Sequence, residues 1–233
     1  MFTSVILGAG KSTRMKANKS KLLFNIAGKP VINHILSSLK AAKAKHNICV
    51  INNSSAELKK ILQAEKISFV YQKILDGTAG AVKAALKSKK NSNSKILILC
   101  GDVPFITSSS IKKLVAKLKN HDAVVGTVEL ESPKGYGRII RVNNKFSSIV
   151  EEKESTPEQR QIREVNTGII AIQEKVLRKY ISSYPSRSIS HETTPIVLRL
   201  TSAKLSFSMM LLTKPFLKLS AIFSVSKPVT INS

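Results

Sequence analysis

Short apolar runs alternate with helical patterns through the first hundred residues, and this alternation constrains the fold more than any other feature. The apolar runs lie at residues 5–7, 48–51, 68–71 and 96–100. The helical patterns between them lie at residues 31–42, 56–64 and 77–86. A βαβ rhythm of this kind predicts an α/β fold with a mostly parallel sheet, whose ligands gather beyond the carboxyl ends of the strands. We therefore look for chemistry in the loops after Leu7 and Cys100.

The spacing of the apolar runs changes after residue 122. Three runs, at 123–128, 137–142 and 146–150, follow one another closely and are separated by turn residues such as Pro133, Gly135 and Asn143-Asn144. Closely spaced strands joined by turn residues favour antiparallel pairing. We expect antiparallel additions to the parallel sheet, which makes the sheet mixed.

The chain carries an extreme positive charge. Its 38 Lys and Arg residues against 14 Asp and Glu give a net charge of +24, which first suggests a polyanionic partner. The lysines are nevertheless spread along the whole chain, and no recognisable nucleic-acid-binding module accompanies them. We expect a solvated basic surface with non-specific affinity for nucleic acid, and no specific nucleic-acid partner.

Cysteine use and hydropathy bear on location. Cys49 and Cys100 lie in apolar stretches typical of buried strands, and two cysteines cannot build a disulfide framework, which favours the cytoplasm. The N-terminus begins with a strand pattern and no secretory leader. Residues 205–225 are fairly apolar but are interrupted by Lys214, Pro215 and Lys218, so we expect no membrane insertion.

A glycine-containing loop follows the first strand. Its sequence, from Leu7 through Gly8, Ala9 and Gly10 to Arg14 and Met15, offers backbone N–H groups and cations that can hold phosphates. The glycine spacing matches neither the Walker A loop nor the dinucleotide fingerprint. Lys21 lies in a segment that could return over the same loop and add a further cation.

Asp102 follows the buried run at 96–100 directly, in the sequence Gly101-Asp102-Val103-Pro104. Its carboxylate is expected at the carboxyl edge of the sheet, where an oxygen ligand for Mg²⁺ is useful. Cations from one loop and a metal-binding carboxylate from another suit displacement at a nucleoside triphosphate, in which alignment and charge neutralisation provide most of the catalysis. Each motif alone could equally be a structural turn.

Taken together, these residues resemble the uridyltransferase domain of bacterial N-acetylglucosamine-1-phosphate uridyltransferases, which have a Rossmann-like nucleotidyltransferase fold and form the N-terminal half of a bifunctional enzyme. The resemblance runs from about Ser4 to Tyr180. It rests on six pieces in order: residues 7–15, Gln72 with Gly77-Thr78, residues 101–104, residues 135–138, residues 149–151 and residues 164–169.

The resemblance implies a role for each matched residue. The loop of Leu7, Gly8, Ala9 and Gly10, with Arg14 and Lys21, would hold the triphosphate. Gln72, Gly77 and Thr78 would bind the nucleotide, with Gln72 and Gly77 at uracil. Gly137, Glu151 and Asn166 would bind the sugar, and Asp102 would bind Mg²⁺. The implied substrates are UTP and N-acetylglucosamine 1-phosphate, in UDP-N-acetylglucosamine biosynthesis for peptidoglycan and lipopolysaccharide. The sugar phosphate is itself the nucleophile, so Arg14, Lys21 and Asp102 are the expected catalytic residues, and no protein nucleophile is needed.

The chain departs from the family pattern in places. Gly8 stands for the usual Ala, Ser12 for Gly, Ser20 for Pro and Cys100 for Tyr, and Thr78-Ala79-Gly80 stands for Thr-Gly-His. A serine at position 12 would be strained by roughly 1–2 kcal/mol if that position needs positive φ.

The larger departure begins at residue 193. Codons for the family's Tyr-Tyr-Thr-Asp, read one base late, give Thr193-Thr194-Pro195-Ile196, and the last 48 residues contain no Gly or Asp. We therefore predict a nucleotidyltransferase domain at residues 1–192 and an out-of-frame tail at 193–233, with Val225-Ser226 in place of the family's second Mg²⁺ ligand, an Asn. The family's C-terminal β-helix acetyltransferase domain is absent, so we do not expect the homo-oligomer that it assembles.

Three other interpretations stay open. The chain could be a non-catalytic remnant of the enzyme, a nucleotidyltransferase for another sugar or base, or, on charge alone, a nucleic-acid-binding module.

Overall fold

A computed structural model describes residues 1–10, 20–52, 56–75, 77–90, 94–182 and 207–211. Its main sheet is built from β1 (Phe2–Leu7), β4 (His46–Ile51), β5 (Ser68–Tyr71), β6 (Lys95–Cys100), β7 (Ala123–Glu129), β10 (Glu164–Gln173) and β11 (Phe207–Leu211). The helices are α1 (Val31–Ala41), α2 (Ala56–Ala64), α3 (Gly77–Lys87), α4 (Ser108–Lys117), α5 (Pro157–Arg160), α6 (Glu174–Ser182) and the 3₁₀ helix η2 (Lys21–Leu23).

The strand order in the main sheet is β11-β7-β10-β6-β1-β4-β5. Strands β6, β1, β4 and β5 pair in parallel, as the βαβ rhythm predicts. Strand β10 is antiparallel to both β6 and β7, so its first half lies at the edge of the sheet where β6 and β7 end. This reversal brings residues from late in the chain to the carboxyl edge of the parallel strands.

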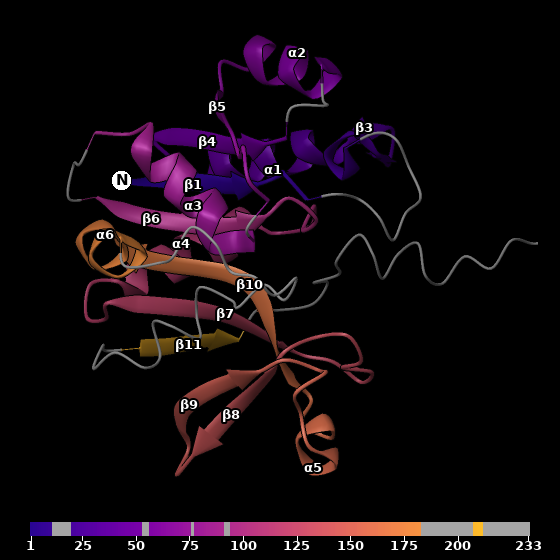
Figure 1. Ribbon diagram of the computed structural model, residues 1–233, viewed down its shortest axis with the longest axis vertical. Helices are drawn as coiled ribbons and strands as arrows, with labels where there is room; N and C mark the ends of the chain where they lie inside the picture. Colours follow the sequence, from indigo (N-terminus) through magenta and orange to yellow (C-terminus); the bar gives the residue numbers. More distant parts are fainter. Residues whose placement is uncertain (11–19, 53–55, 76, 91–93, 183–206, 212–233) are drawn as a thin grey trace, which may run out of the picture.

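Strands β8 (Arg138–Val142) and β9 (Lys145–Val150) form an antiparallel hairpin that pairs with β10 through β8. Together with α5 this hairpin extends away from the main sheet (Figure 1). The turn at its tip contains Asn143 and Asn144, both with positive φ, a conformation that asparagine tolerates. The predicted antiparallel additions are therefore present. Two short strands, β2 (Asn25–Ile26) and β3 (Lys29–Pro30), form a separate ribbon before α1.

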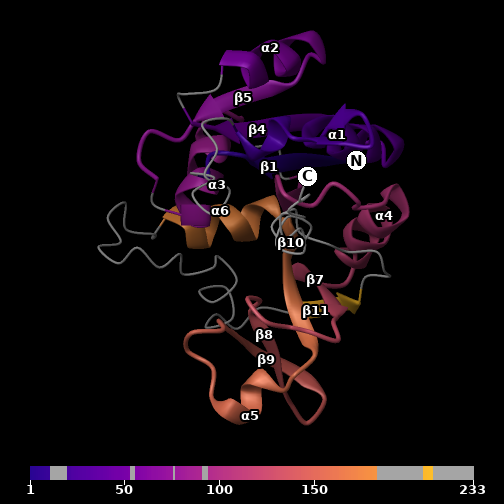
Figure 2. The ribbon, with the colours of Figure 1, turned by 90° about the vertical axis from the view of Figure 1, so that its right-hand side faces the viewer.

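Helices cover both faces of the sheet, and side chains alternate between the two cores along each strand. Ile6, Cys49 and Leu97 face the core that α1, α2 and α4 close. Val5, Ile48, Ile98 and their neighbours face the core that α3 and α6 close. Figure 2 shows these two helical layers on opposite sides of the sheet.

The helices form because their apolar residues recur every three or four positions. In α1, Ile32, Ile35 and Leu39 are fully buried on one stripe, while Lys40 is exposed. Helix α4 begins after Thr107, whose side chain accepts a hydrogen bond from the N–H of Ser110. Within the described residues, no helix is long and apolar enough to span a membrane.

The predicted tail lies mostly outside the described residues, and so do its start at residue 193 and Val225-Ser226. The exception is β11, which pairs in parallel with β7 from Phe207 opposite Ala123 to Leu211 opposite Thr127. The predicted domain boundary at residue 192 also falls outside the described part.

Candidate active site

The loops after β1, β4 and β6 meet at the carboxyl edge of the sheet. The N–H of Gly8 donates to the carbonyl of Val50 at 2.8 Å, and the N–H of Gly101 donates to the carbonyl of Leu7 at 2.9 Å. These bonds continue the ladder one residue past each strand and fix where the two loops begin. Residues 8–10 and Asp102 are thereby held at one edge, as the sequence predicts.

Leu22 seats the η2 segment against this edge. Its side chain is fully buried, and its two terminal methyl groups lie against the two glycines that begin the loops. A Cβ added to Gly8 would lie 2.5 Å from Leu22 Cδ1, and one added to Gly101 would lie 2.4 Å from Leu22 Cδ2. The family pattern has alanine at position 8. In this chain, Leu22 fills the space that the methyl group of that alanine would take.

Lys21 precedes this buried leucine and forms an ion pair with Asp102. The distance from Lys21 Nζ to Asp102 Oδ2 is 3.0 Å, and the two side chains are only 21% and 16% exposed. The return of the Lys21 segment over the first loop, which the sequence suggested, is present in the fold. The pair places one cation and one carboxylate side by side at the end of β6.

The second oxygen of Asp102 suits a cation. Asp102 Oδ1 is buried and has no hydrogen-bond partner among the described residues. A buried carboxylate oxygen without a donor is costly, and a metal ion would satisfy it. The described residues contain no cluster of three or more His, Cys, Asp or Glu side chains, but Mg²⁺ commonly uses one or two carboxylates and takes its other ligands from water and phosphate.

The phosphate loop is described only in its first half. Ala9 is buried, whereas Gly10 is exposed and has open space where a Cβ would point. The predicted residue Arg14 lies outside the described residues, as does Ser12. Asn52, which the sequence analysis missed, donates its side-chain amide to the carbonyl of Ala9 at 3.3 Å and ties the loop to the end of β4.

Of the predicted nucleotide-binding residues, Gly77 and Thr78 begin α3, whereas Gln72 directly follows β5. Gln72 follows β5, and its backbone N–H donates to the carbonyl of Ile51 at 3.0 Å. Its side-chain amide donates to the carbonyl of Gly77, also at 3.0 Å. Gly77 has φ of +88°, which glycine adopts without strain. The structure therefore brings Gln72 and Gly77 into direct contact.

The three predicted sugar-binding residues are also brought together. The N–H of Asn166 donates to the carbonyl of Gly137 at 2.8 Å. A Cβ added to Gly137 would lie 3.1 Å from Glu151 Oε1 and 3.0 Å from Ile149 Cγ2, so the glycine permits the close approach of the carboxylate. A carboxylate accepts hydrogen bonds from sugar hydroxyls, and an amide can both accept and donate them.

A bulge in β10 links this cluster to Asp102. The pairing of β10 with β7 shifts register between Asn166 and Ile170, and Gly168 within the bulge has φ of +76°. The Asn166 side chain accepts from the N–H of Gly168 at 3.0 Å. The carbonyl of Gly168 lies 4.0 Å from Cys100 Sγ, two residues before Asp102. Cys100 is half-buried here, whereas Cys49 is fully buried, and neither cysteine forms a disulfide within the described residues.

Arg138 is a second residue whose role the sequence did not reveal. Its side chain is 1% exposed, and its guanidinium donates to the carbonyls of Tyr136 and Arg160 and pairs with Glu152 at 2.8 Å. Glu152 also accepts from the N–H of Gly135 at 3.0 Å. These contacts fix the loop that carries Gly137.

Comparison with known proteins agrees with this geometry. The sequence pattern of one family, the MobA-like NTP transferase domain, matches residues 4–160, which is more than half of the chain. The chain belongs to this family. It is therefore a nucleotidyltransferase domain. The matched range includes the first loop, η2, Gln72, Asp102, and Gly137 and Glu151, which are predicted to bind the sugar.

Relatives of greater length share this domain. The chain is 38% identical over 191 residues to the bifunctional protein GlmU of Francisella tularensis subsp. novicida, a match that covers 81% of this chain and 41% of GlmU. It is 36% identical over 188 residues to GlmU of Buchnera aphidicola subsp. Baizongia pistaciae, covering 81% and 42%. The chain thus spans about two fifths of the length of these relatives, and the match confirms the resemblance described from the motifs.

Solved structures share the fold. A Bacillus anthracis protein assigned as a glucose-1-phosphate thymidylyltransferase superposes with a TM-score of 0.72 at 20% identity, covering 90% of this chain and 87% of that one. HddC of Yersinia pseudotuberculosis superposes with a TM-score of 0.73 at 20% identity, covering 94% of each chain. The predicted Rossmann-like α/β fold with a mostly parallel mixed sheet is confirmed.

Proposed function

We propose that this nucleotidyltransferase domain is a sugar-phosphate uridylyltransferase that transfers UMP from UTP to N-acetylglucosamine 1-phosphate and releases pyrophosphate. The observation that carries the proposal is the contact between Lys21 and Asp102 beside the Gly8–Gly10 loop, with the Gly137, Glu151 and Asn166 cluster joined to the same edge through the β10 bulge. The relationship to GlmU supports this choice of substrates.

The proposed reaction needs alignment more than acid–base chemistry. A phosphate oxygen of the sugar 1-phosphate forms a bond to the α-phosphorus of UTP, and the bond from that phosphorus to the bridging oxygen of pyrophosphate breaks. Lys21 and the backbone N–H groups of the first loop would neutralise charge on the triphosphate, and Arg14 would add a second cation. The sugar phosphate is already anionic at neutral pH, so no protein base is required.

Asp102 would hold Mg²⁺ through the oxygen that lacks a donor. The ion, when bound, would neutralise the phosphate oxygens and orient the triphosphate. The ammonium group of Lys21 pairs with the other oxygen of Asp102 at 3.0 Å. Lys21 would therefore contact the same triphosphate that the ion orients.

On the nucleotide side, Gln72 and Gly77 would recognise uracil. A primary amide supplies both a donor and an acceptor, which are the two functions that the edge of uracil requires. Its present donation to the carbonyl of Gly77 shows the direction in which the amide points.

The test is pyrophosphate release from UTP with N-acetylglucosamine 1-phosphate and Mg²⁺, compared among the wild type, Asp102→Asn and Glu151→Gln. Asp102→Asn keeps the shape of the side chain but removes the charge that would hold Mg²⁺. It should lower kcat by a factor on the order of 100, because a weakly held Mg²⁺ neutralises the phosphates less well. Glu151→Gln should mainly raise KM for the sugar phosphate.

Three outcomes would replace the proposal. Folded wild-type protein that releases no pyrophosphate with any sugar phosphate would indicate a non-catalytic remnant. Equal rates with glucose 1-phosphate would indicate a different acceptor, and a preference for another nucleoside triphosphate would reassign the base.

We also propose the setting of this reaction. Peptidoglycan and lipopolysaccharide synthesis would use the product, and the reaction would take place in the cytoplasm, where UTP is available.

A further inference from the structure

A cavity lies at the opposite end of the sheet from the proposed active site. Its volume is about 510 Å³, within the range of small-molecule sites. It is formed by the amino ends of β1, β4 and β5 together with Ser88, Lys89 and Lys90 after α3 and Ser94 before β6. Because the six residues of β1 are separated by steps of about 3.3 Å, its first residue beside the cavity lies about 17 Å from its last residue before the first loop.

The cavity is lined by cations and hydroxyl groups. Lys45, His46 and Lys90 contribute donors from two segments, and no acidic side chain is among the lining residues. Within the described residues, none of these three side chains takes part in an ion pair or hydrogen bond. The charges of the two lysines are therefore available to an anion, and the hydroxyl of Ser68 lies in the same wall.

The remaining wall is apolar. Val70 of β5 is half-buried here, and the buried Ile48 of β4 lies on the same face of the sheet. An apolar wall beside a cluster of cations suits a ligand with two parts, one apolar and one anionic. A free inorganic anion would use only the first set of contacts.

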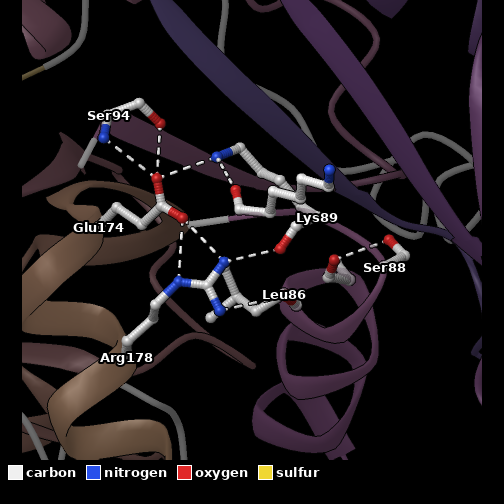
Figure 3. A network of polar contacts seen from close by, with 8 residues as sticks. Leu86, Ser88, Lys89, Ser94, Glu174 and Arg178 are labelled. Carbon is white, nitrogen blue, oxygen red and sulfur yellow. Dashed lines mark hydrogen bonds and ion pairs between the residues drawn. The ribbon is translucent and has the colours of Figure 1, made fainter. Parts of the chain in front are cut away.

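One side of the cavity is held rigid by Glu174. This carboxylate is fully buried and accepts hydrogen bonds from the N–H and hydroxyl of Ser94 at 3.0 Å and 2.8 Å and from Lys89 Nζ at 2.9 Å. Arg178 binds its other oxygen at 2.8 Å (Figure 3). A wall fixed in this way loses little entropy when a ligand binds.

We propose that this cavity binds a small phosphomonoester that carries an aromatic or other apolar group, at a site separate from the nucleotidyltransferase centre. Lys45 and Lys90 neutralise the phosphate dianion, the imidazole of His46 and the hydroxyl of Ser68 donate hydrogen bonds, and Val70 and Ile48 pack against the apolar group. The two lysines and several donors favour a phosphate over a monoanionic carboxylate.

The test uses phenyl phosphate as the probe and the ¹H–¹⁵N spectrum of the full chain as the readout. Amide shifts should concentrate at Thr3, His46, Ser68, Phe69 and Ser94, while Gly8 and Gly101 stay unmoved. Phenol and inorganic phosphate should each bind at least ten-fold more weakly than phenyl phosphate, and benzoate should also bind more weakly.

The deciding variant is Lys45→Ser/Lys90→Ser, which should weaken phenyl phosphate binding about ten-fold. Its matched control is Lys112→Ser/Lys113→Ser, which removes the same charge from exposed lysines of α4 and should leave the affinity unchanged. Equal loss in both pairs, or shifts spread over all lysine-rich surfaces, would overturn the proposal. The readout does not depend on catalysis, so it fails or succeeds independently of the uridylyltransferase assignment.

Discussion

At the scale of single residues, Leu22 links the parts of the proposed active site. It fills the space over Gly8 and Gly101 and thereby sets the position of Lys21 relative to Asp102. The contact explains why the first loop of this chain begins with a glycine that has ordinary backbone angles. The glycine is required by a neighbouring side chain rather than by a left-handed conformation.

Gly8→Ala should destabilise the protein by about 1–3 kcal/mol, because the new methyl group overlaps Leu22. Leu22→Val in the same chain removes the overlapping atoms and should recover at least half of the loss. Urea denaturation of the two single variants and the double variant measures the coupling. Strictly additive effects would show that Leu22 does not limit the space at Gly8.

A second residue-scale prediction concerns Gly137. Gly137→Ala should displace the Glu151 carboxylate, since the added carbon would lie 3.1 Å from Oε1. If the proposed function holds, KM for N-acetylglucosamine 1-phosphate should rise about ten-fold, a loss of roughly 1.4 kcal/mol. KM for UTP in the same assay is the internal control, and an equal rise in both constants would contradict a local effect on the sugar side.

At the scale of elements, Glu174 joins helix α6 to the segment before β6 and to the end of α3. Burial by itself would raise the pKa of Glu174, but the hydrogen bonds from Lys89, Ser94 and Arg178 outweigh it and lower the pKa to about 2. Arg178 in turn donates to the carbonyls of Leu86 and Lys89 at 3.2 Å and 3.0 Å. One carboxylate therefore orders three segments that are distant in sequence.

Glu174→Gln should lower the free energy of unfolding at neutral pH by about 3 kcal/mol, because it leaves Lys89 and Arg178 without their anion. The folded-state pKa lies below the ordinary value of 4.5, so the stabilisation is present above about pH 4.5 and is lost as the pH falls toward 2. The gap between wild type and variant should close over that interval in urea denaturation. Glu65→Gln, at an exposed position, is the control and should show no such gap.

At the scale of the whole molecule, the net charge of +24 dominates behaviour in solution. We expect binding to duplex DNA without sequence preference, driven by counterion release, with affinity falling steeply between roughly 50 and 200 mM salt. Fluorescence anisotropy with two unrelated duplexes across this range tests it. Sequence-specific binding that survives the higher salt would instead favour a nucleic-acid-binding module.

The origin of the tail is also a question about the whole chain. We predict that the nucleotide sequence encoding residues 193–233, shifted by one base, encodes a family-like continuation that begins Tyr-Tyr-Thr-Asp. Sequencing the gene tests this directly. A coding sequence with no such frame would mean that the tail, including the β11 strand beside β7, belongs to the original chain.

The sequence by itself determined the α/β architecture, because apolar periodicity and turn residues are local properties. Helix α2 begins and ends at the predicted residues 56 and 64, and β5 occupies the predicted run at 68–71. It also identified the residues at the carboxyl edge, since parallel strands place their following loops together. Family motifs supplied the roles that we propose for those residues, because Gln72 or Asn166 alone would be read as an ordinary turn or strand residue.

Only the tertiary structure decided which of these residues meet. The reversal of β10, the bulge at Gly168 and the packing of Leu22 between two glycines depend on contacts between segments far apart in the chain. Asn52 and Glu174 carry no local sequence pattern, and the motif around Arg138 does not reveal the partners of its guanidinium. In all three cases the partners are backbone groups and side chains that the fold alone brings near. The basic cavity at the amino ends of the strands is hidden for the same reason: its walls come from separate segments that folding alone makes neighbours.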